Sequence, residues 1–292
     1  MNAMAVDHFF DSADGLRLYA RRYVADRRDA LPLLCLPGLT RNSRDFIDLA
    51  EHLQPQHEVL AADLRGRGRS AWDSEPSHYA LPFYVQDAFA LLDSCHIERS
   101  IIVGTSLGAL MGLAMAAMRP QRVAGLVLND AGPELELVGL RRIAGYAGKL
   151  PAVSSWPQAV AQAKSVYGAA LPDLSEAEWL TYTQRAYREN EAGAPVPDMD
   201  PMISDAFKVP PAASLDLWGL YDSIGPVPIL VIRGGLSDLL SEATVARMVR
   251  QKPQVQQLTL ANRGHTPLLN EPPARAAIDA FVAQYGRGGS ES

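Results

Sequence analysis

The sequence has few cysteines, no excess of basic charge and no long apolar run, and each shortage excludes a class of protein. Two cysteines among 292 residues, Cys35 and Cys95, lack the spacing of a metal site and are expected to be buried free thiols. Lysine and arginine number 27 against 33 aspartates and glutamates, so the net charge of −6 provides no general attraction to nucleic acid or to an anionic membrane. We therefore expect neither as a partner.

The short apolar runs and the first residues of the chain indicate where in the cell the protein is expected. None reaches the roughly 20 residues that a membrane helix needs, and the first residues lack a basic segment followed by an apolar core. These features favour a cytoplasmic protein. The composition, 48% hydrophobic and 21% charged, is that of a globular chain long enough to bury a large core, and it says nothing about oligomeric state.

Short apolar runs alternate with helical patterns through the first 132 residues, which is typical of a mostly parallel sheet with helices on both faces. Helical segments without a convincing strand fill residues 133–225, and the alternation returns over 226–285. We predict an α/β core formed by residues 1–132 and 226–285. A mostly helical cap at 133–225 interrupts it and covers the carboxyl ends of the strands, and 286–292 form a flexible tail.

A serine lies between an expected strand and an expected helix in "GTSLG", residues 104–108. The run Gly-x-Ser-x-Gly in this setting is typical of a nucleophilic serine on a strained turn, where close neighbours must be small. We therefore predict that Ser106 is a nucleophile. The alternative is a turn whose serine only caps the following helix.

A serine hydroxyl needs a base to remove its proton, and that base is usually a histidine. Five of the six histidines precede Ser106, and His265 alone follows it, in a loop after the last expected strand. His265 is therefore the predicted base.

Two aspartates could hold the imidazole of that histidine. Asp238 follows the strand pattern "VPILVIRGG", residues 227–235, and Asp130 follows the earlier pattern "VAGLVLND", residues 123–130. We favour Asp238 because its loop follows the penultimate strand and the chain order becomes serine, aspartate, histidine. Asp130 is the alternative acid.

The oxyanion of an acyl-transfer intermediate needs N–H donors. The backbone N–H of Leu107 directly follows the nucleophile, and that of Leu39 lies in the loop after "LPLLCLPG", residues 31–38. We predict that these two groups form the oxyanion hole.

Several motifs together resemble the α/β-hydrolase fold superfamily, over nearly the whole chain apart from the insertion. In chain order, they are "LPGLTRNSRDF", "DLRGRGRS", "GTSLG", "RGGLSD" and "RGHTPLLNEP". The resemblance implies a serine hydrolase with a triad of Ser106, His265 and Asp238 beneath a helical cap.

The expected reaction is hydrolysis of a small carboxylic ester or lactone, with a small-molecule acyl substrate and no metal or cofactor. The first alternative is cleavage of a carbon–carbon or amide bond in a carboxylate-bearing metabolite, as similar proteins perform in aromatic degradation. Arg41 and Asn42 could bind that carboxylate. A more distant alternative is a non-catalytic ligand-binding protein with the same fold.

Two further features have competing interpretations. The run "RGRGRS" at 65–70 lacks the Gly-Lys-Ser/Thr of a phosphate loop, so we interpret it as a structural turn. Five aromatic residues of the cap are expected to form its own core or, alternatively, to line a substrate pocket: Trp156, Tyr167, Trp179, Tyr182 and Tyr187.

Overall fold

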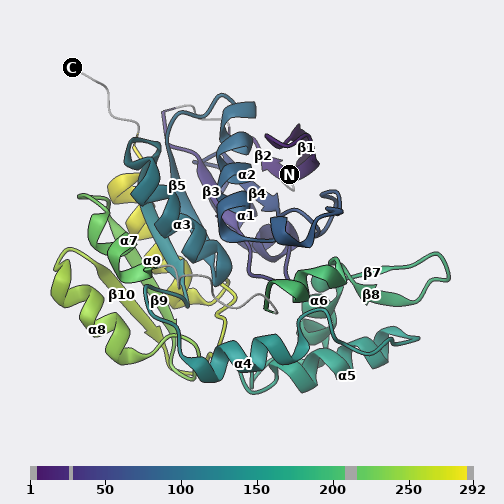
Figure 1. Cartoon of the computed structure of the whole chain (residues 1–292). Helices are drawn as coiled ribbons and strands as arrows, with labels where there is room; N and C mark the ends of the chain where they lie inside the picture. The colour runs from purple at the N-terminus through teal and green to yellow at the C-terminus, as the bar shows by residue number, and fades with distance from the viewer. Residues whose placement is uncertain (1–4, 26–28, 208–215, 288–292) are drawn as a thin grey trace.

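The computed structural model describes residues 5–25, 29–207 and 216–287, and its centre is an eight-stranded sheet (Figure 1). The strand order is β1-β2-β4-β3-β5-β6-β9-β10. β2 runs antiparallel to β1 and β4, and every other neighbouring pair is parallel, which confirms the predicted fold class. The strands are β1 (Val6–Asp11), β2 (Arg17–Tyr23), β3 (Leu33–Leu36), β4 (Val59–Asp63), β5 (Ser100–Thr105), β6 (Val123–Asn129), β9 (Ile229–Gly234) and β10 (Gln256–Leu260).

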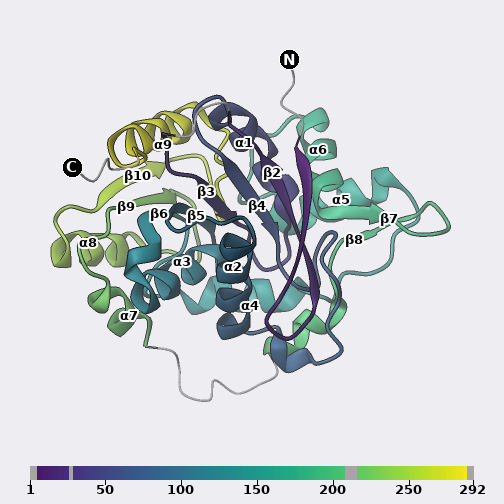
Figure 2. The same ribbon diagram turned by 90° about the horizontal axis from the view of Figure 1, so that it is seen from above.

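Helices cover both faces of the sheet (Figure 2). One face packs against α1 and α9, and the other against α2, α3, α7 and α8. Strands β3, β4 and β6 are buried along their whole length, as expected for parallel strands covered on both sides. The helices are α1 (Ile47–Leu53), α2 (Leu81–Ser94), α3 (Leu107–Met118), α7 (Leu217–Ser223), α8 (Glu242–Gln251) and α9 (Pro272–Tyr285).

The register of the central strands brings their carboxyl ends to one edge. Leu36 of β3 pairs with Gly104 of β5, and Thr105 pairs with Asn129 of β6. Asn129 in turn pairs with Ile232 of β9. The loops that leave these four strands are therefore neighbours in space.

The segment between β6 and β9 forms most of a cap, which lies together on one side of the molecule in Figure 1. The structure corrects two expectations for it. A short antiparallel hairpin lies where no strand was predicted, and α7 packs on the core through Tyr221, as does Ile224 directly after the helix. The remaining cap elements are α4 (Leu137–Tyr146), α5 (Trp156–Tyr167), α6 (Glu176–Ala186), β7 (Tyr187–Glu189), β8 (Pro195–Pro197) and the 3-10 helix Pro201–Phe207.

Ion pairs join the cap to the core. Arg185 of α6 donates to both carboxylate oxygens of Asp48 at 2.8 and 2.7 Å. Arg44 donates to Asp198 at 2.5 Å and to the carbonyl oxygen of Arg185 at 3.0 Å. The end of α6 is thus held against the 3-10 helix and helix α1 that follow β3.

The carboxyl end of the described chain is attached to the core. The Leu31 N–H donates to the Gly286 carbonyl oxygen at 2.7 Å, and Ala30 bridges Arg287. The predicted flexible tail therefore begins two residues too early, and its remainder lies outside the described residues. Within the described ranges, no helix combines the length and apolarity needed to cross a bilayer.

The turn after β4 contains buried arginines. Arg65 is 1% exposed, and it donates to Asp87 of α2 at 2.7 Å, to Asp73 at 2.7 Å and to Asp14 at 2.9 Å. Arg67 is fully buried as well and donates to the Leu39 carbonyl oxygen at 2.9 Å. These contacts support a structural role for the turn, which fixes the loop after β3.

We expect the Arg65→Met variant to lose about 3–5 kcal/mol of unfolding free energy, because the carboxylates of Asp73 and Asp87 would remain buried without their cation. Arg17→Met is the matched control. Its partner Asp11 is exposed, so we expect a loss below about 1 kcal/mol. Urea denaturation measures both, and similar losses in the two variants would contradict a structural role for Arg65.

Candidate active site

Ser106 lies in the tight turn between β5 and α3. Its φ of 53° and ψ of −111° are a strained conformation for a residue with a side chain. A Cβ on Gly108 would collide with the Leu36 carbonyl oxygen, and one on Gly104 would collide with the backbone of Gly108. The two glycines are therefore required for the turn to pack against β3, as the sequence pattern predicts.

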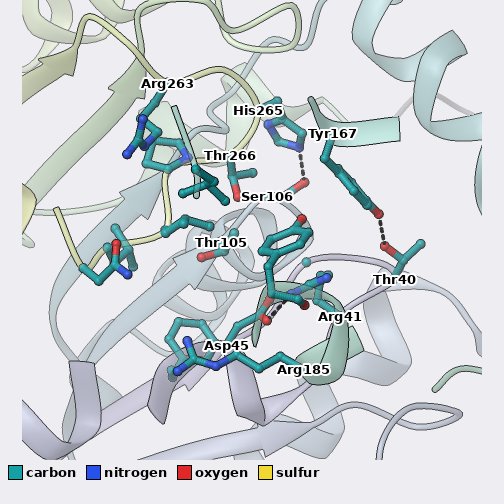
Figure 3. A pocket seen from close by; sticks show the side chains of 18 of the residues that line it. Thr40, Arg41, Asp45, Thr105, Ser106, Tyr167, Arg185, Arg263, His265 and Thr266 are labelled. Atoms are coloured by element: carbon teal, nitrogen blue, oxygen red, sulfur yellow. Dashed lines mark hydrogen bonds and ion pairs between the residues drawn. The ribbon is translucent and has the colours of Figure 1, made fainter. Parts of the chain in front are cut away.

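A chain of hydrogen bonds connects Ser106 to a buried carboxylate. Ser106 Oγ lies 2.9 Å from His265 Nε2, and His265 Nδ1 lies 2.8 Å from Asp130 Oδ2 (Figure 3 shows the first contact). Asp130 is fully buried at the end of β6 and also accepts from the Gly234 N–H at 2.8 Å and from Ser237 Oγ at 2.6 Å. This arrangement can hold the imidazole with Nε2 facing the serine.

The prediction that Asp238 contacts the imidazole is wrong, and the alternative, Asp130, occupies that place. In the loop after β9 the side chain of Ser237 faces Asp130, whereas Asp238, one residue later, faces α4. There Arg142 donates to both of its oxygens at 2.6 and 2.7 Å, which lowers the pKa of the Asp238 carboxyl. Asp238 thus joins the cap to the core.

The two predicted oxyanion donors border the serine. Leu107 is the first residue of α3, and Leu39 follows Gly38, whose backbone approaches the Ser106 side chain. Within the described chain, neither N–H donates to a protein acceptor. Both N–H groups are therefore free to bind an oxyanion. Arg67 donates to the Leu39 carbonyl oxygen, which fixes the loop that carries one of these two groups.

Ser106 and His265 open into a cavity of about 340 Å³ between the core and the cap. Its walls come from the loop after β3, from α4, α5 and α6, and from the histidine loop. Three arginines border it, and each is paired with a carboxylate: Arg41 with Asp45, Arg185 with Asp48, and Arg263 with Glu271 and Asp173. The cavity is therefore polar without a large net charge.

Arg41 lines this cavity, as the carboxylate-binding alternative requires, but Asn42 does not. Nε and Nη2 of Arg41 donate to Asp45 at 2.8 and 2.5 Å. Burial opposes the positive charge, but Asp45, Tyr182 and Tyr167 together more than offset this effect, so the pKa of Arg41 is raised. Asn42 is 1% exposed, and its side-chain oxygen accepts from the Arg44 N–H at the start of the 3-10 helix. Its side-chain nitrogen donates to the Arg185 carbonyl oxygen of the cap, so both ends of the amide are already hydrogen-bonded.

The cap aromatics divide between the two predicted roles. Trp179 is buried in a small apolar cluster of the cap, whereas Tyr167 and Tyr182 line the cavity. Two further residues of the site were not predicted from the sequence: Tyr146 of α4, which also lines the cavity, and Ser237, which contacts Asp130. Helical spacing shows which aromatics share a face but not which face meets the serine, so no sequence signal distinguished them.

Among the described residues, one group offers three possible metal ligands: Asp14, Asp73 and His78. The guanidinium of Arg65 already lies among them and donates to both aspartates. The group lies outside the cavity that contains Ser106.

Comparison with known proteins identifies the family. Residues 32–272 match the family model described as the alpha/beta hydrolase fold. The 3-hydroxybutyrate-oligomer hydrolase of Cupriavidus necator is 30% identical over 286 residues, which cover 92% of this chain and 94% of that protein. The chain therefore belongs to the alpha/beta hydrolase fold family and is a hydrolase.

Two further relatives agree with this assignment. The 2-(acetamidomethylene)succinate hydrolase of Mesorhizobium japonicum is 26% identical over 235 residues, with 80% of this chain and 81% of that protein covered. The crystal structure of an alpha/beta hydrolase from Novosphingobium aromaticivorans has a TM-score of 0.91 and 41% identity, and the match covers 97% of this chain and 99% of that chain.

We expect Gly108→Ala to destabilise the protein by about 2 kcal/mol or more, because the added methyl group meets backbone rather than a movable side chain. Gly145→Ala, in helix α4, is the control. Nothing lies within 4 Å of the added carbon, so a small gain of about 0.5–1 kcal/mol is expected. Thermal and urea unfolding compare the two, and a Gly108→Ala protein as stable as wild type would contradict this description of the turn.

Proposed function

We propose that the protein is a serine hydrolase that cleaves a small carboxylic ester or lactone through an acyl-enzyme intermediate. The observation that carries the proposal is the hydrogen-bonded chain from Ser106 through His265 to Asp130 at a cavity wall. The name of the Cupriavidus relative supports an ester substrate, because oligomers of a hydroxy acid are joined by ester bonds.

Each residue has a defined task in this reaction. His265 Nε2 takes the proton of Ser106 as Oγ attacks the carbonyl carbon, and the N–H groups of Leu107 and Leu39 stabilise the resulting oxyanion. Protonated His265 then donates to the departing alcohol. A water molecule, deprotonated by His265, attacks the acyl-enzyme and releases the acid while Ser106 regains its proton. Asp130 orients the imidazole and stabilises its charged form.

Arg41 supports a second candidate function, the cleavage of an amide or carbon–carbon bond in a substrate that carries a carboxylate. The same residues can attack an amide or an activated carbon–carbon bond, and a cavity-lining arginine favours a substrate that carries a carboxylate. A panel of esters, lactones, amides and acidic ring-cleavage products, assayed beside Ser106→Ala, separates these reactions.

We expect Ser106→Ala to reduce kcat by at least about 1,000-fold for every true substrate, because the nucleophile is lost. A fluorophosphonate probe should label the wild-type protein at Ser106, as mass spectrometry of the labelled peptide would show. A folded wild-type protein that stays unlabelled and inactive would instead support a non-catalytic binding protein.

The two aspartates provide a sharper test. We expect Asp130→Asn to reduce kcat roughly 1,000- to 10,000-fold, because the imidazole loses the partner that holds its tautomer. Asp238→Asn removes the ion pair with Arg142 and a charge that acts on His265 from a distance, but no hydrogen bond to the imidazole, so kcat should stay within about fivefold of wild type. Steady-state kinetics on one ester decides, and a larger loss in Asp238→Asn would overturn the assignment of Asp130 as the acid.

A further inference from the structure

A second cavity of about 330 Å³ lies beside the catalytic one. The two cavities share five lining residues: Thr40, Arg41, Tyr146, Tyr167 and Tyr182. The second cavity extends under the β7–β8 hairpin and α5, away from Ser106. The shared residues are therefore a partition between two compartments of similar size.

Aromatic side chains form most of this partition. The ring of Tyr167 lies 5.4 Å from the rings of Tyr146 and of Tyr182, and both pairs meet edge to face. The Tyr167 hydroxyl has a long contact of 3.4 Å with Thr40 Oγ1, drawn in Figure 3. Because side chains rather than backbone separate the compartments, rotamer changes are enough to connect them.

The second cavity is suited to an apolar group. Arg188, a cation on its wall, is paired with Asp198, with Nε 3.5 Å from Oδ1. Most of the lining residues that it does not share with the first cavity are apolar, and seven of them are not aromatic: Leu150, Ala163, Ala186, Val196, Pro197, Met199 and Pro201. Burial of an alkyl group there would contribute roughly 25 cal/mol for each Å² of apolar surface removed from water.

Arg41 offers a polar contact at the partition. Its side chain is 10% exposed, and its Nη1 is buried without a hydrogen-bond acceptor, whereas Nε and Nη2 are held by Asp45. An unpaired buried donor is costly, and an oxygen of a bound molecule would relieve that cost. Both compartments meet at this residue.

We infer that the substrate has two carbonyl-bearing parts and occupies both compartments. One ester carbonyl lies at Ser106, a second carbonyl or carboxylate oxygen accepts from Arg41 Nη1, and an apolar group continues past the three tyrosines into the second cavity. The substrate class is thus an ester of an acyloxy acid. This inference rests on the proposed function of the same site.

Three matched compounds test it: methyl butanoate, methyl 3-butanoyloxybutanoate and the free acid of the latter. Val196→Trp and, separately, Leu150→Trp fill the second cavity. We expect each to lower the ratio of kcat/KM for the diester over methyl butanoate by about tenfold. Val138→Trp, at a position 68% exposed on α4, should keep the wild-type ratio.

The outcomes are separable. If both cavity variants fold and keep the wild-type ratio, the second cavity does not bind substrate and the inference fails. If wild type hydrolyses methyl butanoate but neither the diester nor the free acid above the Ser106→Ala rate, the inference fails and the proposed function stands. If wild type hydrolyses no ester or lactone of the panel above that rate, the proposed function itself fails. Circular dichroism checks that each variant folds. If Val196→Trp does not fold, Leu150→Trp alone decides the test.

A separate experiment tests the contact between Arg41 and the second oxygen of the substrate. Arg41→Met combined with Asp45→Leu removes the guanidinium without leaving its carboxylate unpaired. A selective loss on the free acid identifies a carboxylate as the acceptor, and a selective loss on the diester identifies a carbonyl. Equal losses on all three compounds would overturn the contact between Arg41 and the second oxygen.

Discussion

The arrangement of the site depends on the hydrogen bonds that the buried carboxylate of Asp130 accepts. This carboxylate accepts from the Gly234 N–H at the end of β9, from Ser237 in the following loop and from His265, so one side chain joins the end of β6 to two segments that are far from it in sequence. A fully buried charge is tolerable only when it is hydrogen-bonded in this way. The same contacts that offset its desolvation fix the imidazole opposite Ser106.

A second layer of buried charge holds the loops around this centre. Arg65 fixes the turn after β4 through three aspartates, and Arg67 of that turn holds the Leu39 carbonyl oxygen. On the cap side, Arg142 and Arg185 are anchored by Asp238 and Asp48. The cap is thus positioned by ion pairs at both its beginning and its middle, which fixes where its tyrosines face the serine.

The sequence predicted the sheet, the strained serine turn and the histidine, because each depends on local pattern or on chain order. Those signals do not separate the two aspartates. Asp130 and Asp238 both follow a strand, both lie between Ser106 and His265 in the chain, and β6 and β9 are neighbours, so both loops leave the same edge. The direction in which the side chains of Ser237 and Asp238 point decides which aspartate contacts His265. The cap hairpin was missed because its two strands have only three residues each, too few to show an alternating pattern.

The position of Asp238 also bears on how the cap and the catalytic centre are related. Ser237 and Asp238 are adjacent, and the first contacts Asp130 while the second contacts the first helix of the cap. That helix ends at Tyr146, a member of the partition between the two cavities. Helix α4 is therefore attached to the same short loop that supports Asp130. The first helix of the cap and the hydrogen-bonded chain from Asp130 to Ser106 are consequently connected through two neighbouring residues.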